Sequence, residues 1–404
     1  MTRPAAVTRA ADPHHPIRPT AAFSSPRRTL TGSGEALRIE LPAPWTDHVE
    51  LVAEALAGFE VDDEVRAPGT GPVAFGALPF DRDAGASLVV PEVVHGVTAE
   101  GARWTTTVQG TADRPCATSR HDRATEPDHA PVGEVTIRST RSPADWCAAV
   151  RAATERIAAG GLTKVVLARE LELRADRAFD PVEVLERLAE RHPTALRFLV
   201  DGFVGASPEL LVSRVGEVVR AQPMAGTAAR TGEPEADQRR AAELLASEKN
   251  RVEHQITIDV VHDTLLPWCS YLDAEPAPTV VQAGPVQHLA TLVEGRLSRP
   301  APSVLELVAA LHPTPAVGGW PRDPAIELIG ELEGADRGRY AGPVGWVDAE
   351  GNGAWAVGIR SVQLAGPVAR LFAGVGVVAD SDPAAELAET RAKARTLLEV
   401  LVQL

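Results

Sequence analysis

Apolar and polar residues alternate with two different periods along this chain, and the periods predict where strands and helices lie. The segment TKVVLARELEL at 163–173 alternates with a period of two, which is typical of a β-strand. The same alternation places Lys164, Val166, Ala168 and Glu170 on one face of that strand. We therefore expect Lys164 to stand at the beginning of a strand, beside apolar neighbours.

Two further regions, 196–222 and 339–378, consist of short apolar segments separated by turn residues. Within the second region we expect a strand before Trp346, one strand over 354–364 and another over 369–378. Strands joined by tight turns pair antiparallel, which argues against a doubly wound parallel sheet. The pattern predicts an α+β protein (α/β in the broad sense) with mainly antiparallel sheets.

A period near 3.6 predicts helices between these strands. They are expected at 45–60, 143–159, 181–191 and 236–266, with a final helix that Asp382 caps and Pro383 begins. Short strands are expected at 72–80 and 87–91. Residues 1–20 lack any period and predict a disordered tail, and the polar, Pro-broken segment 110–133 predicts a linker or long loop.

Composition narrows the class of protein. The 404 residues carry a formal net charge of −15, which argues against a nucleic-acid partner, since phosphate binding needs a surplus of Lys and Arg. The three cysteines lie far apart with no CxxC pair, so neither a disulfide framework nor a cysteine zinc site is supported. No apolar run is long enough for a membrane span, and the N-terminus has no secretory core. We expect a cytoplasmic protein.

Lysine is scarce in this chain. Of the 40 basic residues only Lys164, Lys249 and Lys393 are lysines, and the rest are arginines. Arginine stays protonated, whereas a desolvated lysine can lose its proton and act as a base. Chance survival on a solvated face explains any one of them equally well.

Four acidic residues have contexts that suit chemistry. Glu209 follows Ser-Pro where a strand begins, and a carboxyl in a partly apolar site can stay protonated and act as a general acid. Glu253 lies within a predicted helix, and Glu386 and Glu389 form one stripe with Lys393 at i, i+3, i+7. An exposed strand end and a solvated ion-pair ladder are the plain alternatives. Two helices that each present a glutamate to one cavity would also suit Mg²⁺.

Two other segments point to a ligand less strongly. The loop HPTPAVGGWP at 312–321 can bring backbone N–H groups close to a ligand, or can simply be a turn before a helix. His288 is as well explained by a core position as by a pocket. The GVG at 374–376 is weak evidence for a dinucleotide site, because no GxGxxG opens a helix here.

Taken in order, these motifs resemble the chorismate-utilising enzyme family, which includes isochorismate, salicylate and anthranilate synthases. The resemblance rests on TKVVLARE, FVGASPELLVSR, AGTAAR, LLASEKNRVEH, QHLATLVEG, LHPTPAVGGWP, IGELE, GPVGWVDAEGNGAWAVGIRS, LFAGVGVVADSDP and ELAETRAK. The N-terminal segments FSSPRRTLTGSG and PVAFGALPFDRDAGASLVVPE resemble the siderophore-pathway isochorismate synthases. The implied fold is a single large domain over 21–404, with two large sheets flanked by helices. It comprises a variable part, 21–135, and a core, 136–404.

The resemblance also implies catalytic and metal-binding roles. Lys164 matches the lysine that activates the attacking water, and Glu209 matches the acid that protonates the departing C4 hydroxyl. Glu253 and Glu389 match the two Mg²⁺ ligands. Glu386 and Asn250 match family residues that lie next to these ligands rather than on the metal itself. Asn250 stands where the family usually has an acidic residue.

The remaining implied positions surround the substrate. Arg360 and Tyr340 match the groups that hold the enolpyruvyl carboxylate. The full set implied to bind substrate is Gly226, Thr227, His288, Ala316, Tyr340, Arg360, Gly374 and Lys393.

Isochorismate synthase is the activity that the resemblance favours, as a Mg²⁺-dependent monomer acting on chorismate without a glutaminase partner. Lys164 points to water rather than ammonia as nucleophile. Ala316, where salicylate synthases tend to carry threonine, favours stopping at isochorismate, while Tyr340 suits the salicylate enzymes. Salicylate synthase, a menaquinone-pathway isochorismate synthase and a non-catalytic chorismate-binding relative remain alternatives.

Overall fold

The period-two segments form the strands of three sheets in the computed structural model, which describes residues 4–11, 17–109 and 134–402. Within those residues the larger sheet has 13 strands. Their order is β10 (Val135–Ser139), β11 (Lys164–Ala175), β25 (Val368–Val377), β24 (Ser361–Ala365), β13 (Phe203–Ser207), β12 (Leu196–Val200), β2 (Ala21–Ser24), β3 (Arg28–Ser33), β8 (Val93–Thr98), β9 (Arg103–Gln109), β1 (Ala5–Ala10) and β5 (Glu60–Asp63), with β21 (Gly319–Trp320) beside β11.

The second and third sheets are smaller. The nine-stranded sheet runs β17 (Cys269–Ala274), β20 (Val293–Leu297), β15 (Val218–Gln222), β14 (Leu210–Val215), β23 (Gly353–Val357), β22 (Pro343–Asp348), β6 (Val73–Ala77), β7 (Ala86–Val90) and β4 (Leu37–Leu41). The three-stranded sheet runs β16 (Met224–Ala229), β19 (Val286–Ala290) and β18 (Thr279–Ala283). Apart from the parallel pair β1–β5, the paired strands are antiparallel, as predicted.

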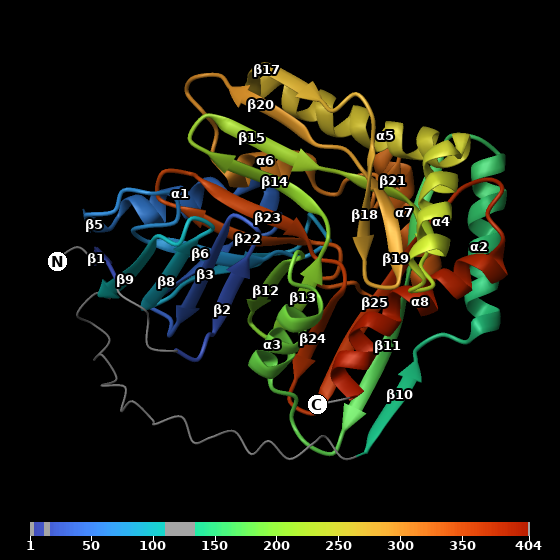
Figure 1. Cartoon of the computed structure of the whole chain (residues 1–404), viewed down its shortest axis with the longest axis horizontal. Helices are drawn as coiled ribbons and strands as arrows, with labels where there is room; N and C mark the ends of the chain where they lie inside the picture. Colours follow the sequence, from blue (N-terminus) through green and yellow to red (C-terminus); the bar gives the residue numbers. More distant parts are fainter. Residues whose placement is uncertain (1–3, 12–16, 110–133, 403–404) are drawn as a thin grey trace.

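Helices flank these sheets (Figure 1). They are α1 (Glu50–Ala57), α2 (Pro143–Ala158), α3 (Pro181–Arg191), α4 (Pro234–Ala246), α5 (Glu248–Leu265), α6 (Val304–Leu311), α7 (Arg322–Glu333) and α8 (Pro383–Val402), with short 3-10 turns at Trp45–Asp47 and Leu266–Trp268. The expected α+β class and flanking helices are confirmed. Within the described residues no helix is long and apolar enough to cross a membrane.

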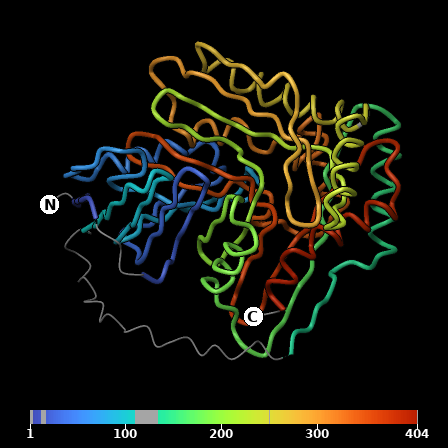
Figure 2. Tube along the Cα trace, viewed as in Figure 1, coloured from blue at the N-terminus to red at the C-terminus, as the bar shows by residue number. Residues whose placement is uncertain are grey.

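Apolar side chains fill three buried clusters. One lies between the two large sheets and includes Phe23, Phe75, Trp104, Phe198 and Trp346. A second is formed where α3 and α8 cover the larger sheet, and the third includes residues of α1, α2, α5, α6 and α7. Figure 2 shows that the strands of the first 109 residues gather at one end of the molecule. Strand β11 and helices α5 and α8, which carry Lys164, Glu253 and Lys393, lie toward the other end (Figure 1).

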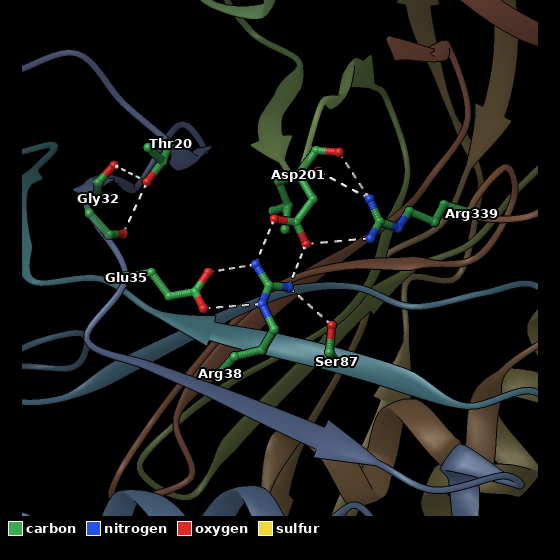
Figure 3. Close-up of polar contacts among 9 residues, drawn as sticks. Thr20, Gly32, Glu35, Arg38, Ser87, Asp201 and Arg339 are labelled. Carbon is green, nitrogen blue, oxygen red and sulfur yellow. Dashed lines mark hydrogen bonds and ion pairs between the residues drawn. The ribbon is translucent and has the colours of Figure 1, made fainter. Parts of the chain in front are cut away.

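A surface ion network joins the two large sheets. Arg38 of β4 contacts Glu35 at 2.7 Å and Asp201, in the β12–β13 turn, at 2.9 Å. Arg339 reaches the same Asp201 carboxylate from the opposite side, at 3.4 Å, as Figure 3 shows. The hydrogen bond from Arg38 is the main reason why the pKa of Asp201 lies below its ordinary value.

Three predictions of local structure are wrong. Residues 5–10, placed in a disordered tail, form β1, in which Ala6 and Thr8 are fully buried. The tail carries no periodic signal of its own because its order comes from β9 and β5, which lie far along the chain. The loop predicted at 110–133 lies outside the described residues.

The other two corrections concern breaks within predicted elements. The helix expected at 236–266 is interrupted at Ser247, whose extended backbone and side chain cap α5 through the Asn250 amide. The strand expected at 354–364 is two strands, β23 and β24, in different sheets. Arg360, with a left-handed φ of 51°, lies at the break between them.

Candidate active site

Two of the places where the chain passes between the two large sheets carry a predicted site residue. Glu209 lies between β13 and β14, and Arg360 lies between β23 and β24. The crossings are bonded to each other, because the Ala206 amide donates to the Arg360 carbonyl and the Val357 amide donates to the Glu209 carbonyl, both at 3.1 Å. Sheet topology therefore brings together two residues that lie 151 positions apart, from 209 to 360.

Lys164 is the first residue of β11 and is buried opposite α5. Its Nζ lies 2.7 Å from Oε1 of Glu253, and the two side chains are 3% and 16% exposed. Gly376 on the neighbouring strand β25 makes room for this pair, since a Cβ there would lie 2.8 Å from Cε of Lys164. The GVG motif thus has a steric role at this site rather than a nucleotide-binding one.

Glu209 is a buried carboxyl close to two lysines. Burial raises its pKa to about 8, against the smaller opposing effects of the Met224 amide, Lys164 and Lys393. At neutral pH the side chain is therefore mostly protonated and can donate a proton.

Helix α8 presents a second ion pair to the same region. Nζ of Lys393 lies 2.7 Å from Glu389 and donates to the carbonyl of Gly374 at 2.9 Å. Burial alone would raise the pKa of Glu389, but Lys393 and a hydrogen bond with Thr227 lower it overall. Glu389 is therefore ionised and available to a cation.

His288 and Arg360 form the opposite wall. Burial first, and then Arg360 and Lys393, lower the pKa of His288 to about 3, so its ring is neutral. Nδ1 of that ring lies 3.1 Å from the Gly226 carbonyl, and Nε2 lies 3.3 Å from Nη2 of Arg360. A neutral ring that donates from Nδ1 and accepts at Nε2 satisfies both contacts.

Tyr340 completes this wall. Its ring stacks on Phe372 with centroids 5.2 Å apart, and its hydroxyl bonds to the backbone of Gly374. Burial raises the pKa of Tyr340, so the hydroxyl keeps its proton and can donate to a carboxylate.

Two adjoining lobes of about 60 and 70 Å³ lie among these side chains, and His288, Ala316 and Lys393 line both. Lys164, Glu209 and Glu253 line one lobe, and Tyr340 and Arg360 line the other. Every residue predicted to be catalytic or to bind substrate contributes to one of the lobes: Lys164, Glu209, Gly226, Thr227, His288, Ala316, Tyr340, Arg360, Gly374 and Lys393. A larger cavity of about 710 Å³, between α5 and residues 320–324, holds none of them.

The other predicted residues lie behind the lobes. Glu389 reaches them through Lys393 and Thr227. Asn250 packs close to Gly226 and donates from Nδ2 to Ser247 at 2.9 Å. Glu386 lies one helical turn before Glu389 on α8.

Sequence reasoning missed another buried ion pair, Glu333–Arg337, which supports the strand that carries Lys164. The side chains lie 2.5 Å apart and are 4% and 2% exposed. Strand β11 pairs with β21 at residues 164–165 and with β10 from residue 171, which leaves a gap along that edge. Glu333 accepts from the Ala168 amide at 2.6 Å, and Arg337 donates to the Val166 carbonyl at 2.6 Å.

The same pair also holds the loop that contains Ala316, because Arg337 donates to the Val317 carbonyl at 2.9 Å. Two side chains therefore replace the missing strand and fix one wall of the lobes. Glu333 ends the IGELE motif, so the sequence marked the position, although no local pattern indicated its contacts.

The residues present fit a sparse magnesium site. Within the described ranges no group of three or more His, Cys, Asp and Glu side chains could hold a metal. Glu253 and Glu389 each bind an ammonium instead, and each offers the hard oxygen donors that Mg²⁺ prefers. One or two protein carboxylates, supplemented by water and substrate oxygens, is the usual arrangement for that ion.

Comparison with known proteins agrees with this geometry. Residues 19–402 match the family described as chorismate binding enzyme. The chain is 38% identical to the isochorismate synthase DhbC of Bacillus subtilis over 96% of this chain and 95% of that protein. It is 40% identical to the putative isochorismate synthase MenF of Mycobacterium tuberculosis over 82% of this chain and 87% of that protein.

A solved structure gives the same result. The crystal structure of the putative 2,3-dihydroxybenzoate-specific isochorismate synthase DhbC from Bacillus anthracis superposes with a TM-score of 0.80 at 34% identity, covering 95% of this chain and 96% of that one. The family match spans both large sheets apart from β1, and it includes every residue that lines the two lobes. The chain belongs to the chorismate-binding enzyme family, and its relatives include isochorismate synthases of both the DhbC and the MenF type.

Proposed function

We propose that this chain is an isochorismate synthase, which adds water to C2 of chorismate while the C4 hydroxyl leaves. The observation that carries the proposal is that Lys164 and Glu209 line one small lobe. An amine and a protonated carboxyl in one cavity supply the base and the acid that the reaction needs.

The second lobe suits the substrate's side chain. Chorismate has two carboxylates, and the buried guanidinium of Arg360 with the Tyr340 hydroxyl can hold the enolpyruvyl one by paired donors. Lys393, with Gly226 and Thr227, is then left for the ring carboxylate. Binding both ends would orient the ring between Lys164 and Glu209.

Lys164 must lose a proton before it can act as a base. In the structure its Nζ is paired with Oε1 of Glu253 at 2.7 Å. A cation held by Glu253 would compete with Lys164 for this carboxylate, so Lys164 would be released from the ion pair. A bound Mg²⁺ would supply charge compensation for the ring carboxylate, with Glu253 and Glu389 as its protein ligands.

The decisive experiment is chromatography of the products formed from chorismate with and without Mg²⁺. The proposal expects isochorismate only when the ion is present. Unchanged chorismate would instead identify a non-catalytic relative, and anthranilate formed with ammonium would indicate the amine branch.

A magnesium titration followed by calorimetry tests the metal ligands. Glu389→Gln should weaken Mg²⁺ binding by about 100-fold, and Glu386→Gln by about tenfold, as expected for a group behind the ligands. Equal affinity in wild type and Glu389→Gln would exclude Glu389 as a ligand.

Salicylate synthase is the second candidate, since Tyr340 lines the lobe that also contains Arg360. Salicylate and pyruvate in the same chromatogram would establish it. The isochorismate would feed siderophore or menaquinone synthesis, because relatives of both kinds match this chain. The proposal includes a monomeric enzyme that works in the cytoplasm. It needs no glutaminase partner, because water rather than ammonia is the nucleophile.

A further inference from the structure

A further cavity of about 340 Å³ adjoins the candidate site on another side of Arg360. Arg360 lines both this cavity and the lobe of Tyr340. Pro208 lines both this cavity and the lobe of Lys164. A neighbouring hollow of about 380 Å³ shares Arg191, His192 and Arg230 with it. We call these two connected hollows the antechamber.

Three of the segments that enclose the antechamber come from α3, the β18–β19 hairpin and α8. Residues 191–195 are the last residue of α3 and the loop after it, residues 281–285 are the end of β18 and the turn to β19, and Thr396 and its neighbours belong to α8. Thr396 lies one helical turn beyond Lys393, which lines the lobes. The same face of α8 therefore extends from the candidate site into the antechamber.

The walls of the antechamber carry a surplus of positive charge. Four arginines line it, against one carboxylate, Glu399, and they are Arg191, Arg230, Arg360 and Arg395. The whole chain, by contrast, has a net charge of −15. Glu399 lies 3.6 Å from Arg191, and the buried Asp237 lies 3.2 Å from Arg230, so part of the surplus stays uncompensated.

His192 and Thr396 also line the antechamber, and neither adds negative charge to it. Burial first, and then Arg360 and Arg191, lower the pKa of His192, so the ring adds no charge at neutral pH. The hydroxyl of Thr396 is buried and has no hydrogen-bond partner among the described residues. Oγ1 of Thr396 would lie 3.0 Å from a Cβ at Gly284, whose φ of +61° lets the β18–β19 turn pack this closely. A buried hydroxyl with an unused donor suits an oxygen-bearing ligand.

We propose that the antechamber is the site at which the enzyme first captures its dianionic substrate, a small cyclic dicarboxylate, before it passes Arg360 into the lobes. This inference rests on the proposed function. An enzyme with a net charge of −15 repels a dianion over most of its surface. A local positive opening would counter that repulsion and raise the rate of productive encounter.

The test is the ionic-strength dependence of kcat/KM for chorismate in Arg191→Gln/Arg395→Gln. Both side chains lie at the surface of the antechamber, outside the two lobes. The double variant should have a kcat/KM about tenfold lower at low salt with kcat unchanged, because steering acts on encounter. The difference should disappear near 1 M salt, where the Debye length is about 3 Å.

Arg239→Gln is a control for the loss of surface charge, because Arg239 lies on exposed α4 and does not line the antechamber, although this variant removes one arginine charge where the double variant removes two. It should match wild type in kcat/KM. The inference is overturned if the double variant behaves like Arg239→Gln, or if its loss persists unchanged at high salt. Equal melting temperatures would show that all the variants fold alike.

Thr396→Val and Thr396→Ser test whether the Thr396 hydroxyl contributes to the antechamber. Valine removes the hydroxyl at nearly constant volume and should raise KM a few-fold without changing kcat, while serine should keep the wild-type KM. Equal KM values in both variants would remove Thr396 from the capture site. Failure of the proposed function would look different, since wild type would then make no isochorismate at any salt concentration.

Discussion

Two buried ion pairs, Glu333–Arg337 and Lys164–Glu253, lie at the same strand, β11. They differ in how many further hydrogen bonds their charged groups make. Glu333–Arg337 bonds to three backbone groups of β11 and the 313–319 loop, in addition to its own contact. Among the described residues, Glu253 is the single ion-pair partner of Lys164, and both side chains face a cavity. The first pair is saturated and holds the site together, whereas the second can exchange partners. That difference separates a structural pair from one available for chemistry.

The largest effect is expected from Lys164→Ala. Loss of a positioned general base should lower kcat by about 10²–10⁴-fold, measured as isochorismate formed per unit time. Lys164→Arg is the control, because it keeps the charge but cannot give up the proton. If the arginine variant retained wild-type kcat, Lys164 would not be the base.

Glu209→Gln should lower kcat by a similar factor, about 10²–10⁴-fold, if the carboxyl is the general acid. Wild-type activity should fall as the pH rises through about 8, where Glu209 loses its proton, and the glutamine variant should lack that limb. A pH–rate profile of both proteins provides the measurement. An identical alkaline limb in both would assign it to another group.

Glu209→Gln also has a predicted effect on stability. Since folding raises the pKa of this carboxyl, its cost to stability is absent below the unfolded value of about 4.5 and grows as the pH rises toward about 8. The variant should therefore have a higher melting temperature than wild type at pH values above 8, and little advantage below pH 4.5. A variant less stable than wild type at alkaline pH would contradict the burial effect.

Arg337→Met should reduce the free energy of unfolding by about 3–5 kcal/mol, because it leaves Glu333 buried without a partner. Urea titration measures this loss. The double change Glu333→Leu/Arg337→Met is the control and should recover part of it, since no buried charge remains. Recovery should be incomplete, because Ala168 and Val166 would still lack their bonds. A single variant as stable as wild type would mean that the pair does not support β11.

Gly376→Ala should cost about 1–3 kcal/mol of stability through overpacking and should reduce kcat, because the new methyl would displace Lys164. Gly330→Ala in α7 is the matched control, since nothing lies within 4 Å of its added Cβ. That control should be neutral or stabilising. Wild-type kcat in Gly376→Ala would show that the position of Lys164 is not critical.

The smallest effect is expected at the surface network of Arg38. Arg38→Gln should cost about 0.2–1 kcal/mol in urea titration and leave kcat unchanged, because exposed ion pairs are screened by solvent. The network of Figure 3 touches neither lobe. A change in kcat would mean that the contact between the two sheets also shapes the site.

Local pattern was sufficient for many elements. Residues that are close neighbours in the sequence are enough to predict the helix at Pro181–Arg191, the β11 strand and the Asp382 cap of α8. The motifs that carried the family resemblance are likewise short local segments. Local pattern failed at β1 and at the break between β23 and β24, because the partners that decide these features are distant in the chain.

The sequence by itself determined which side chains are candidates for the chemistry, because lysine, glutamate and arginine differ in charge and proton affinity wherever they are placed. Only the tertiary structure decided which of them meet. The crossings between sheets brought Glu209 to Arg360, Gly376 left space for Lys164 beside Glu253, and the gap along β11 selected Glu333 and Arg337. Burial, and the pKa that follows from it, is a property of the packed interior, so no local pattern along the chain contains it.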